Sequence, residues 1–210
     1  MANSKNNRSD KNCRLLTCNQ EVFISTLNVR TIRKQGKTEE LAHLFNSTKQ
    51  SILGVVDHKL VHSDEAIKTQ ELEKCTLITT SAWRNASGAA SGGVGLLVNR
   101  GIEKTLTDIE PFNERILIAH FNGNPKTTVI VHYAPTEGSE NSEDHYRNLA
   151  NAVNSIPKHN VLLVVGDCNA HIGKDSANYT YHETTNRNGK LLLGLAEESN
   201  LIVTNTAFQK

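Results

Sequence analysis

Residues 160–165 read NVLLVV and are followed at once by the polar sequence GDCNAH. A short, wholly apolar run bounded by turn residues is typical of a strand that is buried on both faces. We therefore expect this strand to be central in its sheet. The rest of the 210-residue chain alternates short apolar runs with helical segments and lacks a regular βαβ rhythm. This pattern favours a layered α/β sandwich over a doubly wound sheet.

Hydrophobic periodicity predicts the other elements. The expected strands are residues 21–27, 51–56, 77–82, 94–98, 115–121, 127–133 and 201–204. The expected helices are residues 37–50, 143–156 and 190–198. Leu41, Leu44 and Phe45 share one face of the first helix, which we expect to be buried. The two strands that flank the turn sequence NGNP are expected to form a hairpin.

The domain organisation is expected to be simple. Residues 1–20 are polar and are predicted to be a flexible segment, and residues 21–210 are predicted to form one domain. The N-terminal residues lack the apolar stretch of a secretory signal, and no apolar run reaches the ~20 residues of a membrane span. The four cysteines lack metal-binding spacing and are predicted to be reduced thiols. We therefore expect a location in the nucleus or cytoplasm, with no secretion and no membrane.

The charge of the chain is nearly balanced, because Lys and Arg number 23 and Asp and Glu number 22. A dedicated nucleic-acid clamp is usually more basic than this. Contact with phosphate would therefore depend on a local site or on a bound metal. The sequence makes no prediction of the oligomeric state.

Polar residues follow four of the expected strands at the point where each strand ends. They are Asn28, Asp57, Tyr133 and the pair Asp167 and Asn169. One or two carboxylates together with waters are the usual protein ligands of Mg²⁺, and a bound metal can neutralise phosphoryl charge. Asp57 and Asp167 could supply those carboxylates, and the two asparagines could orient water, metal or phosphate. The Tyr133 hydroxyl could donate a hydrogen bond to developing negative charge.

Each of these residues also has a purely structural interpretation. An Asp after a strand commonly forms a turn or caps a helix, and Asn28 could cap a turn. Tyr133 has the strand propensity of a core or edge residue. His58, His62 and His171 could be surface histidines or satisfied core histidines. The occurrence of all four strand-end motifs in one order favours a functional site.

A resemblance to a known family rests on the ordered segments LNVRTI, SAWRN, GGVGLLV, ERI, VHYAPT, GDCNAHIG and NRNGKLLLGLAEESNLIVTNTAF. Over residues 23–208 the chain resembles the endonuclease domain of RTE-type non-LTR retrotransposons, a pattern that craniofacial-development-like proteins share. The wider superfamily is the endonuclease/exonuclease/phosphatase (EEP) group, which includes apurinic endonucleases and DNase I. The resemblance implies a four-layered α/β sandwich of the DNase I-like type, incomplete at its C-terminus. It also implies nicking of DNA that depends on Mg²⁺ or Mn²⁺.

The resemblance implies a role for each matching residue. Asp57 and Asn28 match the metal site, and Tyr133 matches the tyrosine that supports the transition state. Asp167 and Asn169 match the pair that orients the attacking water and the scissile phosphate. The positions that match substrate-binding or recurrent family positions are Arg115, Thr136 and His171. The glycines that we expect to allow a bend or close packing, rather than phosphate binding, are Gly92, Gly93 and Gly95.

Two departures from the family pattern bear on activity. The family's metal-binding acid is normally Glu, whereas this chain has the shorter Asp57, and Mg²⁺ requires near-ideal ligand geometry. The family's terminal Asp-His pair has no counterpart before Lys210. We therefore expect weakened or lost nuclease activity. Two alternatives stay open: a non-catalytic relic or nucleic-acid-binding domain, and a phosphatase of small phosphoesters.

Overall fold

Two β-sheets packed face to face form the body of the protein. The computed structural model describes residues 16–17 and 21–209. The five-stranded sheet contains, in spatial order, β2 (Ile24–Asn28), β3 (Ile52–Val56), β8 (Val94–Asn99), β5 (Cys75–Thr80) and β4 (Ile67–Glu71). The four-stranded sheet contains, in spatial order, β13 (Val161–Asp167), β12 (Thr127–Tyr133), β10 (Ile116–Phe121) and β9 (Leu106–Asn113). Each sheet therefore comes from one continuous part of the chain.

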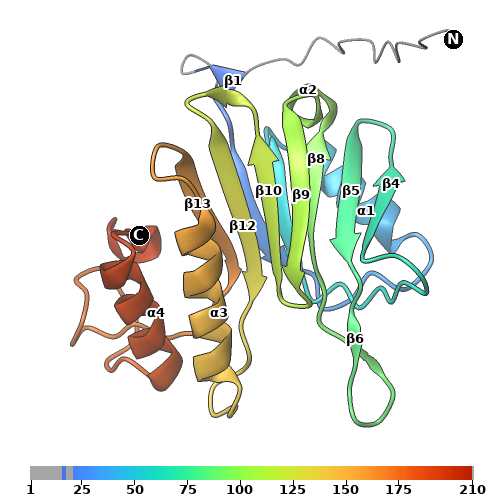
Figure 1. The fold of residues 1–210 in the computed structure, drawn as a ribbon. Helices are drawn as coiled ribbons and strands as arrows, with labels where there is room; N and C mark the ends of the chain where they lie inside the picture. The colour runs from blue at the N-terminus through green and yellow to red at the C-terminus, as the bar shows by residue number, and fades with distance from the viewer. Residues whose placement is uncertain (1–15, 18–20, 210) are drawn as a thin grey trace, which may run out of the picture.

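Helices cover the two outer faces of this pair of sheets (Figure 1). α1 (Lys37–Asn46) packs on the five-stranded sheet, and α3 (Ser142–Ser155) and α4 (Arg187–Glu198) pack on the four-stranded sheet. One apolar cluster lies between the two sheets, and one further cluster lies between each sheet and its helices. The predicted four-layered α/β sandwich is confirmed.

The most apolar strand, β13, lies at the edge of its sheet, so the prediction that it is central is wrong. Leu163 and Val165 face the other sheet, whereas Leu162 and Val164 pack beneath the helices. The apolar run reflects apolar contacts on both faces of the strand, although its residues are only partly buried and Val161 is exposed. It does not report whether both edges are paired, and here one edge pairs with β12.

The predicted hairpin of β10 and β12 is confirmed, with Ile118 opposite Ile130. The strands β4 and β9 were not predicted, because both are edge strands that are partly or mostly exposed and contain many polar residues. The segment between the expected strands 77–82 and 94–98 contains a small arm, in which β6 (Trp83–Arg84) pairs with β7 (Ala90–Ser91). The short helix α2 (Arg100–Glu103) was also not predicted.

Three local predictions are corrected. Leu44 is 53% exposed, whereas Leu41 and Phe45 are buried, so the buried face of α1 is narrower than expected. The expected strand at residues 201–204 is irregular and leads into a 3-10 turn at Thr204–Thr206. Leu16 is buried in the inter-sheet core, and β1 (Leu16–Thr17) pairs with β11 (Gly123–Asn124), so these two residues of the N-terminal segment form a short strand.

The remaining residues of the predicted flexible segment, 1–15 and 18–20, lie outside the described residues, as do Cys13 and Cys18. Cys75 and Cys168 are free thiols, as predicted. Within the described ranges, no helix combines the length and the apolar character that crossing a membrane requires.

Candidate active site

The four predicted strand ends meet at one edge of the sandwich. β2 and β3 are parallel neighbours, and so are β12 and β13, so each pair brings its carboxyl ends together. Tyr133 is directly beside Asp167 in the second pair. The two sheets are joined at this edge because the Asn28 side-chain amide donates a 2.8 Å hydrogen bond to Asp167 Oδ2. This bond links residues 139 positions apart in the sequence.

Left-handed backbone conformations gather at these strand ends. Arg30, Asp57, Lys59 and Asn169 have φ values of 56°, 59°, 61° and 43°. Such conformations are strained for residues other than glycine and persist where surrounding contacts enforce them. Asn28 Oδ1 accepts the Arg30 N–H at 3.0 Å, which fixes the first of these turns.

Asp57 is a buried carboxylate held by two donors. Its Oδ1 accepts the Gly92 N–H at 3.1 Å, and its Oδ2 lies 3.5 Å from Lys59 Nζ. Burial raises the pKa of Asp57, the nearby Lys59 and the Gly92 hydrogen bond act against that rise, and the charge of Asp167 adds to it. Lys59 was not recognised as a site residue, and only its place two residues after a strand-end acid could have indicated it.

Asp167 and Asn169 form a fixed turn after β13. Asp167 Oδ1 accepts the Asn169 N–H at 3.0 Å, and Asn169 Nδ2 donates to the Ala134 carbonyl at 2.8 Å. Asn188, which is fully buried in α4, donates from Nδ2 to the carbonyls of Asn169 and Pro135, each at 3.0 Å. Asn188 thus joins the turns after β12 and β13, a role with no counterpart in the sequence patterns.

Tyr133 and Arg115 form the wall of the site beside these carboxylates. Arg115 Nη1 donates to the Tyr133 carbonyl at 3.1 Å, and the Tyr133 N–H donates to the Arg115 carbonyl at 2.9 Å. Burial raises the pKa of the Tyr133 hydroxyl, and the charges of Asp57 and Asp167 raise it further. The hydroxyl therefore stays protonated at neutral pH and can donate a hydrogen bond.

Trp83, another residue that sequence reasoning did not assign to the site, covers Arg115. The Arg115 guanidinium carbon lies 4.0 Å from the Trp83 ring centroid and 5.8 Å from that of Tyr133. Burial lowers the pKa of Arg115, with the charge of Glu114 acting against that shift. The guanidinium remains a cation because Arg is not deprotonated in proteins.

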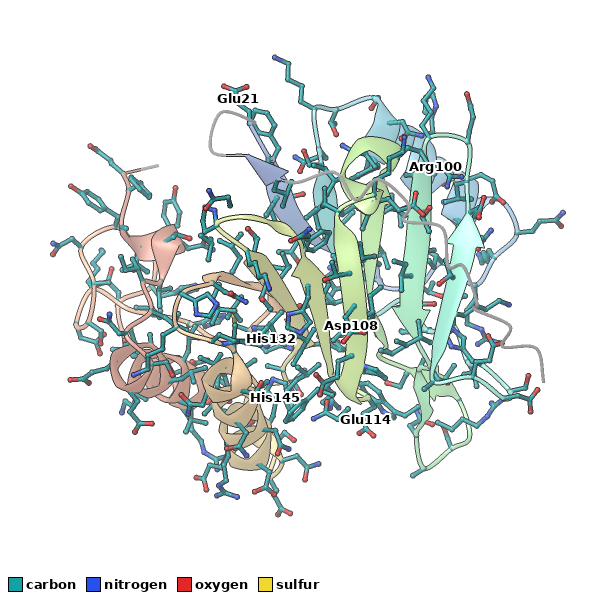
Figure 2. The ribbon with its side chains drawn as sticks, turned by 45° about the horizontal axis from the view of Figure 1, so that its top comes forward. Glu21, Arg100, Asp108, Glu114, His132 and His145 are labelled. Atoms are coloured by element: carbon teal, nitrogen blue, oxygen red, sulfur yellow. The ribbon has the colours of Figure 1, made fainter. Side chains whose placement is uncertain are left out.

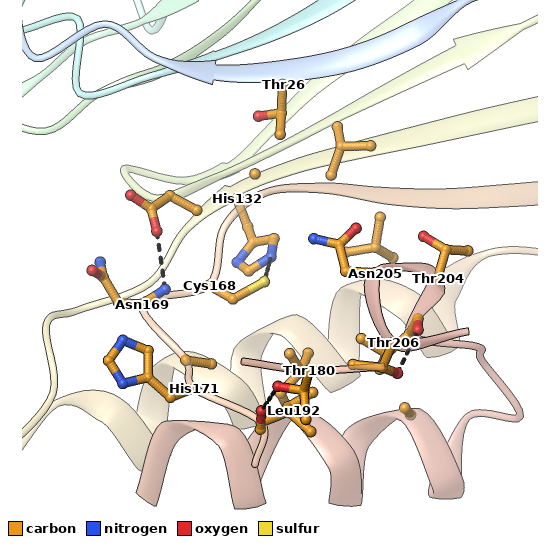
Figure 3. A pocket seen from close by; sticks show the side chains of 18 of the residues that line it. Thr26, His132, Cys168, Asn169, His171, Thr180, Leu192, Thr204, Asn205 and Thr206 are labelled. Atoms are coloured by element: carbon orange, nitrogen blue, oxygen red, sulfur yellow. Dashed lines mark hydrogen bonds between the residues drawn. The ribbon is translucent and has the colours of Figure 1, made fainter. Parts of the chain in front are cut away.

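Two other predicted substrate-binding residues, Thr136 and His171, follow β12 and β13 in the chain. Thr136 is exposed, and its carbonyl accepts the Ser139 N–H in a turn. The His171 ring stacks on His182, with centroids 3.9 Å apart and planes 10° apart. Both histidines line a cavity of about 1040 Å³ that also contains Asn28, Asp167 and Asn169. Figure 3 shows His171 beside Asn169 in the wall of this cavity.

Four further histidines make contacts within the fold. His58 is fully buried, its Nδ1 accepts the Leu60 N–H at 3.0 Å, and its Nε2 lies 3.3 Å from the Val94 carbonyl. This confirms the interpretation of His58 as a satisfied core histidine. His132 and His145 lie together between β12 and α3 (Figure 2), with Nδ1 and Nε2 3.3 Å apart. His62 lies against Thr79, with its Nε2 3.1 Å from Thr79 Oγ1.

The predicted close packing of the three glycines is confirmed. A Cβ at Gly92 would meet the Trp83 ring at 1.8 Å, and one at Gly93 would meet the His58 ring at 2.4 Å. A Cβ at Gly95 would meet the Ile78 carbonyl at 2.6 Å. These positions must stay without a side chain because the neighbouring groups occupy the space.

The donor set at the strand ends fits Mg²⁺ or Mn²⁺. Two carboxylates, Asp57 and Asp167, lie close enough for the charge of one to shift the pKa of the other, and Asn28 contacts Asp167. A divalent cation would relieve this repulsion, and Mg²⁺ is commonly held by one or two carboxylates with waters. No group of three or more His, Cys, Asp or Glu side chains forms a metal-binding cluster in the described part of the chain. Most ligands of such an ion would therefore be waters or substrate.

The chain is similar in sequence to two curated proteins and similar in fold to several solved structures. No protein-family model matches the sequence. Craniofacial development protein 2 of Bos taurus is 28% identical over 204 residues, which are 94% of this chain and 33% of that protein. The same protein of Tragulus javanicus is 27% identical over 209 residues, which are 96% of this chain and 35% of that protein. The chain therefore spans about a third of the length of these curated relatives.

Two solved structures have similar folds. A 3′ phosphatase, NExo, from Neisseria, bound to a product DNA hairpin, has a TM-score of 0.57 and 15% identity. That match covers 83% of this chain and 70% of the other. An AP endonuclease, LMAP, from Leishmania major has a TM-score of 0.56 and 12% identity, over 84% of this chain and 66% of the other. The predicted fold class is confirmed: the chain has the DNase I-like sandwich of the endonuclease/exonuclease/phosphatase enzymes.

Proposed function

We propose that this chain hydrolyses phosphodiester bonds of DNA as a divalent-metal-dependent endonuclease of the RTE-type retrotransposon kind. The hydrogen bond between Asn28 and Asp167 carries the proposal, because it joins two sheets at the edge where the carboxylates gather. The similarity to the 3′ phosphatase and the AP endonuclease supports hydrolysis of phosphate esters in general.

Asp57, Asp167 and Asn28 would hold the metal. When bound, Mg²⁺ or Mn²⁺ would neutralise charge on the phosphoryl oxygens and lower the pKa of a bound water. Asp167 would orient the attacking water, because its two oxygens are fixed by Asn28 and by the Asn169 N–H. Asn169 donates its side-chain N–H to Ala134, so its contribution here is to shape the turn.

Tyr133 and Arg115 would stabilise the phosphoryl group as negative charge develops on it. The Tyr133 hydroxyl stays protonated because its pKa is raised, so it can donate a hydrogen bond. The Arg115 cation, in a partly desolvated position, would add a charge-assisted contact. A fixed donor and a fixed cation need little reorganisation during the reaction, which is the main source of such stabilisation.

One observation favours a second candidate, a non-catalytic nucleic-acid-binding domain. Lys59 Nζ lies 3.5 Å from Asp57 Oδ2, so a cation of the chain already partly neutralises the proposed metal ligand. If Lys59 competes with the metal, removal of its charge should strengthen metal-dependent activity. The variant Lys59→Met keeps an apolar chain of similar length and tests this competition.

Nicking of supercoiled plasmid tests the two candidates. The protein is incubated with plasmid in Mg²⁺ and then in Mn²⁺, beside Asp167→Ala and Lys59→Met. Metal-dependent relaxed circles that disappear in Asp167→Ala support the endonuclease. Binding of DNA without nicking by any of the three proteins supports the non-catalytic domain. Release of phosphate from small phosphoesters without nicking would instead indicate a phosphatase.

A further inference from the structure

Trp83 contacts two parts of the candidate site that are otherwise separate. It lies on β6, in the small arm between β5 and β8, and pairs with Ser91 of β7. Its ring is partly exposed rather than part of a core cluster. Packing in a core cluster therefore does not account for the position of Trp83. Its contacts with the site residues suggest a functional role instead.

The first contact is with Arg115. The Trp83 ring lies 4.0 Å from the guanidinium carbon, at the short end of the range for a cation–π contact. Tyr133 lies on another side of the same guanidinium, at 5.8 Å, and the two aromatic rings are 6.4 Å apart. The guanidinium thus contacts the Trp83 ring and lies near the Tyr133 ring, with one N–H donated to the Tyr133 carbonyl. This arrangement restricts a side chain that would otherwise sample many rotamers.

The second contact is with Gly92. The six-membered part of the indole occupies the space where a side chain at residue 92 would stand. The Gly92 N–H donates to Asp57 Oδ1 at 3.1 Å, and the Gly92 carbonyl accepts the Lys59 N–H at 2.9 Å. Trp83 therefore packs on the peptide segment that fixes the Asp57 carboxylate.

We propose that Trp83 is a positioning residue that holds the phosphate contact Arg115 and the metal ligand Asp57 in one geometry. This inference rests on the proposed function, because it assigns those two residues their roles. Loss of the ring would free the Arg115 side chain and loosen the Gly92 segment together. A change at one residue would then affect DNA affinity and metal affinity at once.

Three variants of Trp83 and Arg115 test the coupling. Trp83→Leu keeps an apolar side chain but has no π face, and Trp83→Phe keeps a ring. Arg115→Ala removes the cation without touching Gly92. DNA affinity is measured by titration of a fluorescent duplex in EDTA, and metal affinity by the Mn²⁺ concentration that gives half of the thermal stabilisation. Both measurements are independent of nicking.

We expect Trp83→Leu to weaken DNA binding about tenfold and to raise the half-saturating Mn²⁺ concentration severalfold. Arg115→Ala should weaken DNA binding without changing the Mn²⁺ concentration. In the Arg115→Ala background, Trp83→Leu should have little further effect on DNA binding but should still change the metal response. Trp83→Phe should restore most of both affinities.

A matched control separates positioning from a loss of stability. Ile102→Val removes a methyl group from a buried side chain in α2, away from the Trp83 and Arg115 contacts, and should leave both affinities unchanged. The proposal is wrong if Trp83→Leu leaves either affinity unchanged, or if its effect on DNA binding adds fully to that of Arg115→Ala. If wild-type protein binds DNA and Mn²⁺ but does not nick plasmid, the proposed function fails while the positioning role is still measured.

Discussion

Acidification from pH 7 to pH 5 should destabilise the fold through histidines that are buried as neutral rings. Burial lowers the pKa of His58 to about 4 and that of His132 to about 4. In an unfolded chain a histidine titrates near ~6.5. Below that pH the unfolded chain binds protons that the folded chain does not, so the free energy of unfolding falls. The stability is fully present above pH ~6.5 and is lost progressively toward pH ~4.

The size of this loss follows from the pKa difference. Between pH 7 and pH 5 each of the two rings should reduce the free energy of unfolding by about 2 kcal/mol, at ~1.4 kcal/mol for each pH unit below the unfolded pKa. His145, whose pKa burial lowers to about 3, acts in the same direction. The raised pKa of Asp57 acts in the opposite direction. A domain has about 5–15 kcal/mol of stability, so the net loss should be large.

Urea denaturation at pH 7, 6 and 5 measures the effect for wild type and His58→Gln. The variant should be less stable at pH 7, because Gln replaces a buried ring that has two polar contacts. Its further loss between pH 7 and pH 5 should be about 2 kcal/mol smaller than that of wild type. The control His43→Gln makes the same change at an exposed histidine of α1 and should follow the wild-type curve. Equal pH dependence in wild type and His58→Gln would refute the reasoning.

Three further predictions concern the site and its supports. Asn28→Ala removes the hydrogen bond to Asp167 and should cost about 1.5–3 kcal/mol of unfolding free energy, measured in urea, since the acceptor is charged; no change in stability would contradict it. Gly93→Ala introduces a Cβ against a buried ring at φ 89° and should cost well over ~2 kcal/mol, whereas Gly88→Ala, at φ 77° in open space, should cost only about 1 kcal/mol. Mn²⁺ at ~100 times its Kd should stabilise wild type by about 2.7 kcal/mol in thermal unfolding, and the stabilisation of Asp57→Asn at the same Mn²⁺ concentration should be smaller. Equal stabilisation of the two proteins would mean that Asp57 is not a metal ligand.

The sequence predicted the layers and the meeting of strand ends because both depend on local patterns. The buried strand β3 is apolar along its length and is directly followed by Asp57, and β12 has an apolar centre and ends with His132 and Tyr133. Parallel neighbours then place Asn28 beside Val56 and Tyr133 beside Asp167 without further information. The edge strands β4 and β9 were not predicted, because strands with many exposed side chains show little hydrophobic periodicity in the sequence.

Three residues that support the site could not be predicted in this way. Trp83 and Asn188 act through contacts set by the packing of whole elements, whereas Lys59 acts through a local contact with Asp57. Asn188 donates to carbonyls 53 and 19 positions away, a relation that exists only after α4 has packed on the sheet. Contacts of this kind require coordinates, or an alignment in which the partners vary together.

The division of the sandwich into two continuous halves has a consequence for protein synthesis. The five-stranded sheet is complete once residue 99 has been made, whereas the partner of Asn28 arrives only with Asp167. At a synthesis rate of about 5–20 residues per second, a nascent chain on the ribosome would therefore contain Asn28 and Asp57 for some seconds before Asp167 is made. During that interval Asp57 could not act together with Asp167 in the proposed site. The two-sheet arrangement thus delays assembly of the proposed site until the strands of the second sheet, residues 106–167, have emerged.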